Sequence, residues 1–284
     1  EEIYQMQLKT YFLTSEISPF SETSFLSHFS KNIPIHLQQK DQDIRITSPK
    51  YGFISERKYI LREVIRLREI ECKIGGEMIK SSAKSAFIPK TRVQVYFMEH
   101  PDWFQPLTPL LYKSRNGRIL SDNSDRFGFF SKMGLAMLTD LFWCPDIVIC
   151  NSWQSATVPL LNNQIYSGVE FYKGIQTVLL IHSLDENAVI PSDTYDKLGV
   201  KLPDSITDGE VNSLVVGALA ADLVIAVDSP EAEISKQLAE HPAFKPHYSA
   251  IKRKLKKLKV LDDSTASFQS AAGDLDSLLR KLAS

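Results

Sequence analysis

Several features that mark common protein classes are scarce in this sequence. Its only cysteines are Cys72, Cys144 and Cys150, and they form neither a CxxC pair nor a zinc-ligand spacing. Scattered thiols in odd number favour a reduced, cytoplasmic setting with the cysteines as apolar core residues, and no metal is implied. No apolar run approaches the ~18 residues of a spanning helix. The polar beginning "EEIYQMQ" is unlike a signal peptide. We therefore expect a cytoplasmic protein without a membrane span.

A strong charge of one sign is missing as well. The chain carries 33 Lys and Arg against 34 Asp and Glu, a formal net charge of -1. This balance indicates neither nucleic acid nor an anionic membrane as a partner. The sequence also lacks a P-loop, a GxGxxG turn and a nucleophile elbow, and we expect no cofactor. With 43% hydrophobic and 24% charged residues, the chain is typical of a globular protein of one or two domains.

Short β-branched or aromatic runs alternate with helical patterns over most of the chain. Apolar spacing predicts a helix over 127–141, capped at Ser124 or Asp125, and a second helix from Trp153 to Ile165. The runs lack strict alternation, which is typical of strands buried on both faces of a sheet. They are "KTYFLTSE", "QDIRITSP", "TRVQVYFME", "PDIVICNS", "IQTVLLIHS" and "ADLVIAVDS". The sequence therefore predicts a single doubly wound, mainly parallel, Rossmann-like α/β sheet.

In such a sheet, ligands bind at the carboxyl ends of the strands. The segments to inspect are Thr14–His28, Pro49–Gly52, Asn151–Gln154, His182–Glu186 and Asp228–Glu231. The loop after the first strand, "TSEISPFSETSFLSHFS", contains no glycine. Glycine normally lets backbone N–H groups approach a phosphate, so this loop lacks the usual means of receiving one.

The end of the chain has a different character. From His241 onward we find no strand signal, and "IKRKLKKLK" sets Ile251, Leu255 and Leu258 on one helical face. We predict an α/β domain over 1–236 and a helical extension over 237–284. The extension either packs back on the domain or presents a basic helix to a protein partner or a membrane surface. A second helical stripe joins Phe268, Ala271, Ala272, Leu275, Leu278, Leu279 and Leu282. No aromatic residues interleave the lysines, which argues against nucleic-acid binding.

These segments resemble, in order, the N-terminal half of bacterial and plant glycogen (starch) synthases, which extend α-1,4-glucan from a nucleotide-activated glucose. The resemblance runs from about residue 8 to about residue 235. It implies a sugar or sugar-nucleotide site in the crevice of a Rossmann-like domain. It is carried by "YFLTSEISPFSETSFL", "DIRITSPKYGFI", "SDRFGFFSKMGLAML", "CPDIVICNSWQSATVPL", "TVLLIHSL" and "ADLVIAVDSPEAEI".

The first loop departs from the family pattern, Lys-Thr-Gly-Gly-Leu-Gly-Asp. The matching residues here are Glu22, Thr23, Ser24, Phe25, Leu26, Ser27 and His28. The family lysine contacts the donor phosphates. A carboxylate ~4 Å from a phosphate charge costs about 4 kcal/mol at an effective dielectric of about 20. Because Glu22 replaces the lysine and Phe25 fills a glycine's space, the resemblance implies a degenerate donor loop.

The residues expected to line the sugar pocket match the family pattern only in part. The family's His-Asp-Trp-His is replaced by Asn151, Ser152, Trp153 and Gln154. His182 matches the family's active-site histidine, which contacts the transferred glucose. The resemblance therefore implies that Asn151, Ser152, Trp153 and His182 line a sugar site, while packing roles remain open for Trp153 and His182.

Length limits the activity that we expect. Family members carry a second Rossmann-like domain, but the sequence after Pro230 ends at residue 284 and shows no strand pattern. Such a domain needs several βαβ units of roughly 30 residues each. We therefore expect a non-catalytic relative, a pseudoenzyme that binds an α-glucan, a protein partner or, weakly, a sugar nucleotide. The alternative is the acceptor-side half of a glucosyltransferase, completed by a separate or missing donor-binding domain.

A third hypothesis is an unrelated activity in the same crevice. Glu16, His182, Asp185 and Glu186 could act as acid and base groups, and paired carboxylates are typical of sugar hydrolysis. Sequence spacing does not establish their separation in space, and fold resemblance does not decide function.

Overall fold

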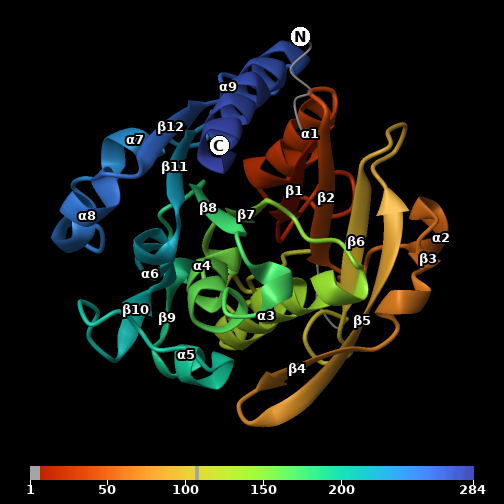
Figure 1. Cartoon of the computed structure of the whole chain (residues 1–284), viewed down its shortest axis with the longest axis horizontal. Helices are drawn as coiled ribbons and strands as arrows, with labels where there is room; N and C mark the ends of the chain where they lie inside the picture. Colours follow the sequence, from red (N-terminus) through yellow and green to blue (C-terminus); the bar gives the residue numbers. More distant parts are fainter. Residues whose placement is uncertain (1–6, 106–108) are drawn as a thin grey trace.

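A computed structural model describes residues 7–105 and 109–284. Its main feature is a 10-stranded, mainly parallel sheet with helices on both faces, the α/β fold expected from the sequence (Figure 1). Every strand predicted above is present, and all of them run parallel to their neighbours in that set. They are β1 (Leu8–Leu13), β2 (Gln42–Pro49), β6 (Gln94–Glu99), β7 (Ile147–Asn151), β8 (Gln176–Ile181) and β11 (Leu223–Asp228).

The strand order fixes where a ligand can bind. From one edge, the strands follow as β12 (Leu255–Lys259), β11, β8, β7, β1, β2, β6, β5 (Glu77–Phe87) and β3 (Arg62–Glu63), and β4 (Ile70–Ile74) pairs with β5. The chain adds β2 and β6 on one side of β1 and then returns to add β7 and β8 on the other. The order therefore reverses between β1 and β7, where Leu13 is the register partner of Cys150. The loops after these two strands diverge and leave a crevice, the usual ligand position in open α/β sheets.

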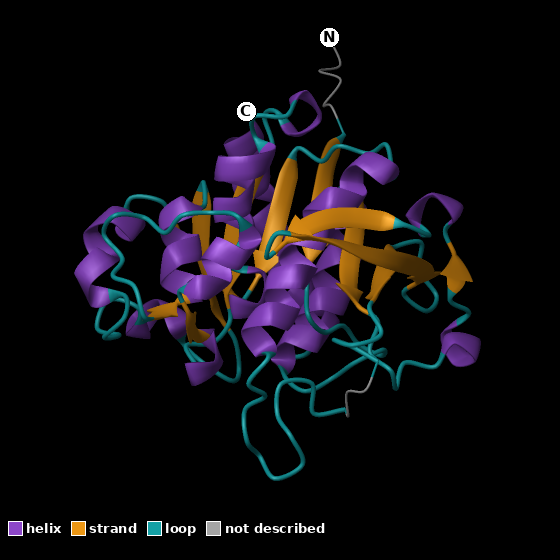
Figure 2. Ribbon diagram, turned by 90° about the horizontal axis from the view of Figure 1, so that it is seen from below, coloured by secondary structure: helices purple, strands orange, loops and turns teal. Residues whose placement is uncertain are grey.

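Two helical layers cover the sheet (Figures 1 and 2). Helices α1 (Phe25–Gln38) and α9 (Thr265–Ala283) pack together on one face. The other face carries α3 (Asn123–Asp140), α4 (Val158–Leu161) and α6 (Ser213–Ala220). Helix α3 lies tightly on β1, because a Cβ added at Gly134 would lie 3.1 Å from Cδ2 of Leu13. Both faces of the central strands are therefore buried beneath helices, which explains why these strands are almost continuously apolar.

Both predicted helices are present, with differences at their ends. Helix α3 begins at Asn123 after Asp122, so the caps predicted at Ser124 and Asp125 are wrong by a few residues. The segment predicted as one helix from Trp153 is helical but broken into η2 (Trp153–Ser155), α4 and the π-helical η3 (Asn162–Tyr166). Two further single turns flank β8, η4 (Glu170–Tyr172) before its amino end and η5 (Glu186–Ala188) after its carboxyl end.

An antiparallel extension of the sheet went unpredicted. It consists of β3 (Arg62–Glu63), β4 (Ile70–Ile74) and β5 (Glu77–Phe87), with α2 (Glu56–Tyr59) and η1 (Ile65–Leu67) before β4. Lys132 holds the hairpin of β4 and β5 against α5 (Asp193–Leu198), because its ammonium group donates to the carbonyls of Lys73 and Leu198. A separate small sheet pairs β9 (Val189–Pro191) with β10 (Glu210–Asn212).

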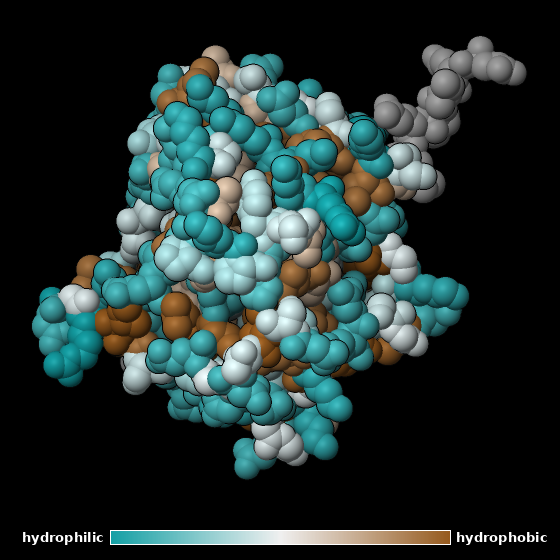
Figure 3. Space-filling view, turned by 90° about the vertical axis from the view of Figure 1, so that its left-hand side faces the viewer, coloured by the Kyte–Doolittle hydropathy of each residue, from teal (hydrophilic) through white to brown (hydrophobic). Residues whose placement is uncertain are grey.

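The prediction of no strand after His241 is wrong. The sequence "IKRKLKKLK" contains the end of the short helix α8 (Tyr248–Lys252) and then β12 (Leu255–Lys259), which pairs parallel with β11. Helical spacing fails here because β11 would otherwise be an open edge, and pairing with it outweighs local propensity. Helix α7 (Ile234–Gln237) and η6 (Lys245–His247) complete this side, whose surface is mostly hydrophilic with scattered hydrophobic patches (Figure 3).

The terminal helix packs back on the domain. Phe268, Ala271, Ala272, Leu275 and Leu279 are buried, and α9 lies along α1. This apolar stripe is therefore covered by the chain's own core. The domain boundary at residue 236 stays a prediction, although β12 joins the segment beyond it to the main sheet. No helix in the described ranges is long and apolar enough to cross a membrane.

Candidate functional site

A pocket of about 310 Å³ opens at the carboxyl ends of β1, β7, β8 and β11. It brings together most of the residues that the sequence analysis singled out. Ser152, Trp153 and His182 line it, as do Thr23, Ser24 and Phe25 of the loop after β1. Asn151 lies directly beneath it, fully buried, whereas Glu22 is exposed on the surface outside it. The remaining lining residues are Glu16, Leu26, Tyr112, Lys113, Gln154, Ser183, Asp185, Asn187, Ser229 and Glu231.

Glu16 organises the glycine-free loop from within. Its side chain is 1% exposed, and one carboxylate oxygen accepts from N and Oγ1 of Thr23 at 2.6 and 2.8 Å. The other oxygen accepts from Oγ of Ser24 at 2.5 Å. Burial raises the pKa of Glu16, and the hydrogen bonds from Ser24 and Thr23 oppose that rise. The donors of the loop are therefore already bonded to a carboxylate of the chain itself.

A second carboxylate occupies the beginning of α1. Glu231, from the loop after β11, accepts a hydrogen bond from the backbone N–H of Phe25 at 2.9 Å. Free N–H groups at a helix N-terminus attract anions, and the helix dipole adds to that attraction. Here the carboxylate of Glu231, rather than a ligand anion, occupies the N-terminus of α1. The sequence analysis assigned anion exclusion to Glu22, but the structure places Glu16 and Glu231 in the pocket instead.

Phe25 takes the space that the resemblance assigns to glycine, and the structure shows what holds it there. Its ring lines the pocket and stacks on Phe268 of α9, with centroids 5.7 Å apart and planes inclined by 16°. A stacked aromatic pair contributes about 0.5–1.5 kcal/mol beyond its buried area. The C-terminal helix therefore fixes one wall of the pocket, a contact that local sequence gives no means of predicting.

A chain of hydrogen bonds fixes the protonation of His182. Nδ2 of Asn151 donates to the carbonyl of Leu13 at 2.9 Å, which turns its Oδ1 toward Nε2 of His182, 3.0 Å away. Because that oxygen only accepts, Nε2 carries the hydrogen and Nδ1 is left with a lone pair. Burial lowers the pKa of His182 to about 3, so the ring is neutral at physiological pH. Asn151 is thus a positioning residue for His182.

Trp153 is packed among aromatic rings at the wall of the pocket. It is 5% exposed and makes edge contacts with Tyr112 and Phe127, with centroids 5.5 and 5.0 Å apart. Ser152, just before it, has a φ of 59°, an uncommon conformation for serine. This kink ends β7 and turns the chain into η2, which places Trp153 and Gln154 in the pocket wall.

The charges that line the pocket are mostly negative. Three carboxylates, those of Glu16, Asp185 and Glu231, face one lysine, the exposed Lys113. Sequence reasoning did not single out Tyr112 or Lys113, because they lie in an irregular stretch before α3. Tyr112 is placed by Ser15, whose Oγ lies 2.7 Å from its hydroxyl. Neutral groups and carboxylates suit sugar hydroxyls better than phosphates.

Three of the four acid and base groups of the third hypothesis come together in the structure. Glu16, His182 and Asp185 line the pocket, but Glu186 is exposed outside it. Both oxygens of Asp185 are bonded locally, to N of Asn187 at 2.9 Å and to Oγ of Ser183 at 2.7 Å. Among the residues that the structure describes, no cluster of three His, Cys, Asp or Glu could hold a metal ion.

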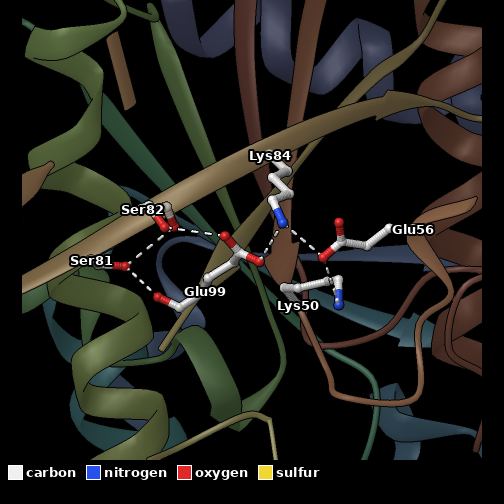
Figure 4. Close-up of polar contacts among 6 residues, drawn as sticks. All are labelled: Lys50, Glu56, Ser81, Ser82, Lys84 and Glu99. Atoms are coloured by element: carbon white, nitrogen blue, oxygen red, sulfur yellow. Dashed lines mark hydrogen bonds and ion pairs between the residues drawn. The ribbon is translucent and has the colours of Figure 1, made fainter. Parts of the chain in front are cut away.

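A second polar cluster lies at the carboxyl ends of β2 and β6 (Figure 4). Lys84 pairs with Glu56 at 2.8 Å and with Glu99 at 3.3 Å, and Oγ of Ser82 donates to Glu99 at 3.1 Å. Lys50, only 4% exposed, lies 3.7 Å from Glu56. The hydrogen bond from Lys84 lowers the pKa of Glu56. Each charge has an opposite partner, so the cluster ties α2 and β5 to the sheet.

Comparisons with known proteins agree with this geometry. A model of the starch synthase catalytic domain matches residues 9–242. The chain is 32% identical over 231 residues to the glycogen synthase of Pelodictyon phaeoclathratiforme, covering 79% of this chain and 46% of that protein. The figures are the same for the glycogen synthase of Chlorobium luteolum. The chain spans about half the length of the curated relatives that it matches.

A solved structure shows the same fold. The catalytic domain of starch synthase IV from Arabidopsis thaliana, bound to ADP and acarbose, superposes with a TM-score of 0.74 at 18% identity. The superposition covers 88% of this chain and 51% of that one. The family model extends over most of the sequence, from β1 past α7. This chain belongs to the starch synthase catalytic domain family.

Proposed function

We propose that the pocket binds a neutral α-glucan, that it excludes the phosphates of a sugar nucleotide, and that this chain transfers no glucose on its own. The observation that carries the proposal is that two carboxylates of the chain itself, the buried one of Glu16 and the exposed one of Glu231, occupy the donors of the loop. Glu16 accepts the hydrogen bonds of Thr23 and Ser24, and Glu231 accepts that of Phe25. A phosphate would have to displace both carboxylates and then lie beside them, and like charges at this separation repel strongly.

The groups left for a ligand support a sugar. Nδ1 of His182 is an acceptor by the hydrogen-bond chain described above. Oδ1 of Asn187 is buried and finds no hydrogen-bond partner in residues 7–105 or 109–284. Ser152 adds a hydroxyl group to the wall. Sugar hydroxyl groups donate to such acceptors and would relieve the cost of an unpaired buried oxygen, about 1–3 kcal/mol.

The test is isothermal titration of the purified chain with maltoheptaose, ADP-glucose, UDP-glucose, ADP and UDP in parallel. We expect heat from maltoheptaose alone, and we expect His182→Ala to weaken it about tenfold, the usual effect of one lost hydrogen bond in a binding site. Asn116→Ala, in an exposed turn outside the pocket, is the matched control. Micromolar binding of either sugar nucleotide would contradict the proposal.

A second candidate follows from the coverage of the relatives, about half of their length. In it, the chain is the acceptor-side half of a glucosyltransferase, and a donor-binding domain elsewhere supplies phosphate recognition. Its test mixes this chain with the C-terminal half of the Pelodictyon glycogen synthase and measures glucose transfer from ADP-glucose to maltoheptaose. Transfer by the mixture, absent from either half, would favour this candidate. If the mixture transfers no glucose, the glucan-binding proposal is favoured.

A further inference from the structure

Strand β12 forms an edge of the main sheet, and its outer side is open. Within the described chain, β12 has β11 as its only neighbouring strand, and α9 packs on one of its faces. β12 and α9 lie after residue 242, where the match to the family model ends. Open edges of this kind invite pairing with another strand.

The hydrogen-bond ladder shows which backbone groups are free. The N–H of Val224 donates to the carbonyl of Lys254, and the N–H of Val260 donates to the carbonyl of Asp228. Alternation along a parallel ladder turns the groups of residues 256 and 258 toward β11 as well. The N–H and C=O groups of residues 255, 257 and 259 therefore point outward, where the described residues offer them no partner.

The side chains around this edge are strongly basic. Lys252, Arg253, Lys256 and Lys259 are exposed, and no carboxylate of the described residues lies within ion-pair distance of them. Two neighbouring lysines are already occupied. Lys257 pairs with the carboxylate of Asp228 at 2.8 Å, and Lys254 donates to the carbonyls of Leu219 and Ala221.

We propose that the outer edge of β12 binds an extended acidic segment of a partner protein, which adds to the sheet as a further strand. Backbone hydrogen bonds to residues 255, 257 and 259 would supply the pairing, and the unpaired cations would select acidic side chains. A second copy of this chain fits poorly. An antiparallel pair centred on Lys257 would set that lysine against its own copy, and two equally basic edges would repel each other, since like charges directly opposite destabilise a sheet.

The sequence predicted that a protein partner binds the C-terminal helices, and we propose the edge of strand β12 as the binding surface instead. The apolar stripe of α9 is covered by α1, whereas β12 has free backbone groups and free charge. Leu258 is buried on the face toward the core, so the strand is held in place before any partner arrives. A preformed edge costs little ordering entropy on binding.

The test uses a short fluorescent peptide of Glu and Val with Glu on both faces of the strand, because Lys256 and Lys259 lie on opposite faces of β12, and it has two controls. One control has Gln in place of Glu, and the other keeps the charge but carries prolines that prevent strand pairing. We expect only the Glu-Val peptide to bind well. We also expect it to slow amide exchange about tenfold at residues 255, 257 and 259. The amides of residues 256 and 258, already bonded to β11, serve as internal controls.

Charge reversal tests the contribution of the lysines. The double variant Lys256→Glu and Lys259→Glu should bind the peptide about tenfold more weakly than the unaltered chain. Added salt should reduce this difference in affinity, because it screens the charges. Lys90→Glu with Lys201→Glu makes the same change of net charge on other exposed surfaces and should have little effect. Circular dichroism melts of each variant show whether the fold is kept.

Three outcomes would overturn the proposal. The first is equal binding of the proline-containing peptide, which would show charge attraction without strand pairing. The second is the absence of binding and of slowed exchange, in which case the lysines only guard the edge against aggregation. The third is binding of a single-stranded oligonucleotide or an anionic lipid vesicle through Lys256 and Lys259, with the amides of residues 255, 257 and 259 unaffected.

Discussion

The carboxylate of Glu231 lies 2.9 Å from the backbone nitrogen of Phe25 and accepts its hydrogen bond at the first residue of α1. These residues are far apart in the sequence, and they meet because β11 and β1 both end at the pocket. The contact fills a place where a helix N-terminus would otherwise attract an anion. Removing this carboxylate should therefore change the affinity for anions.

Freeing the beginning of α1 should create affinity for phosphate. We expect Glu231→Ala combined with Glu22→Lys to bind ADP at least about tenfold more tightly than the unaltered chain, because a like charge is removed and a cation is added nearby. Titration calorimetry at low salt measures the change. Glu233→Ala, on the surface two residues away, is the control. Tight ADP binding by the unaltered chain would show that the internal carboxylates exclude nothing.

Glu16 should make stability fall as pH rises. Its folded-state pKa is raised, so its contribution to stability is complete below the unfolded-state value and is lost as pH climbs through the folded value. Glu16→Gln keeps an oxygen acceptor and has no charge to bury. In urea unfolding at a series of pH values from about 4 upward, we expect the variant to lack this decline. Identical pH profiles for the two proteins would refute the role assigned to burial.

His182 should show the opposite dependence. Its pKa is lowered to about 3 in the folded chain, so stability is present above the unfolded value of about 6.5 and is lost as pH falls toward 3. We expect up to about 1.4 kcal/mol of stability to disappear per pH unit in that window. His182→Gln should remove this component. Imidazole NMR shifts that stay constant between pH 5 and 8 would confirm the neutral ring, and a titration near 6.5 would contradict it.

Asp228 should matter more to the C-terminal segment than its partner Lys257. Asp228 is buried, and although burial raises its pKa, hydrogen bonds from Lys257 and Ser235 lower it overall. Asp228→Asn should cost about 1.5–3 kcal/mol, since charged hydrogen bonds are lost. Lys257→Met should cost clearly less, because that ammonium group is half-exposed and solvent screens its charge.

Urea unfolding measures the free energy of unfolding of both variants. Amide exchange at β12 shows whether the loss of stability is local to the C-terminal segment. The lowered pKa means that the stabilisation by Asp228 is lost only as pH falls below about 4, the usual unfolded value of an aspartate. A larger loss from Lys257→Met than from Asp228→Asn would mean that the ion pair, not the hydrogen bonds to Ser235, anchors the turn after β11.

The sequence by itself determined the central sheet and the place of the site. Runs such as Tyr11–Leu13 and Leu223–Val227 are apolar on both faces, so they can only be buried strands, and strand-helix alternation leaves few topologies. The strand-end rule then pointed to Ser152, Trp153 and His182, which the structure gathers into one pocket. Periodic local patterns carry this information because each residue's environment repeats along the element.

Only the tertiary structure decided what fills the site and where the edges lie. Glu231 reaches Phe25, and Phe268 stacks on it, through contacts between distant segments that leave no local pattern. β12 was predicted as a helix because Leu255 and Leu258 are three residues apart, as on a helical face. It is a strand because it pairs with the otherwise free edge of β11. Pairing and packing between distant segments outweigh local propensities of a few tenths of a kcal/mol per residue, so such features depend on the folded whole.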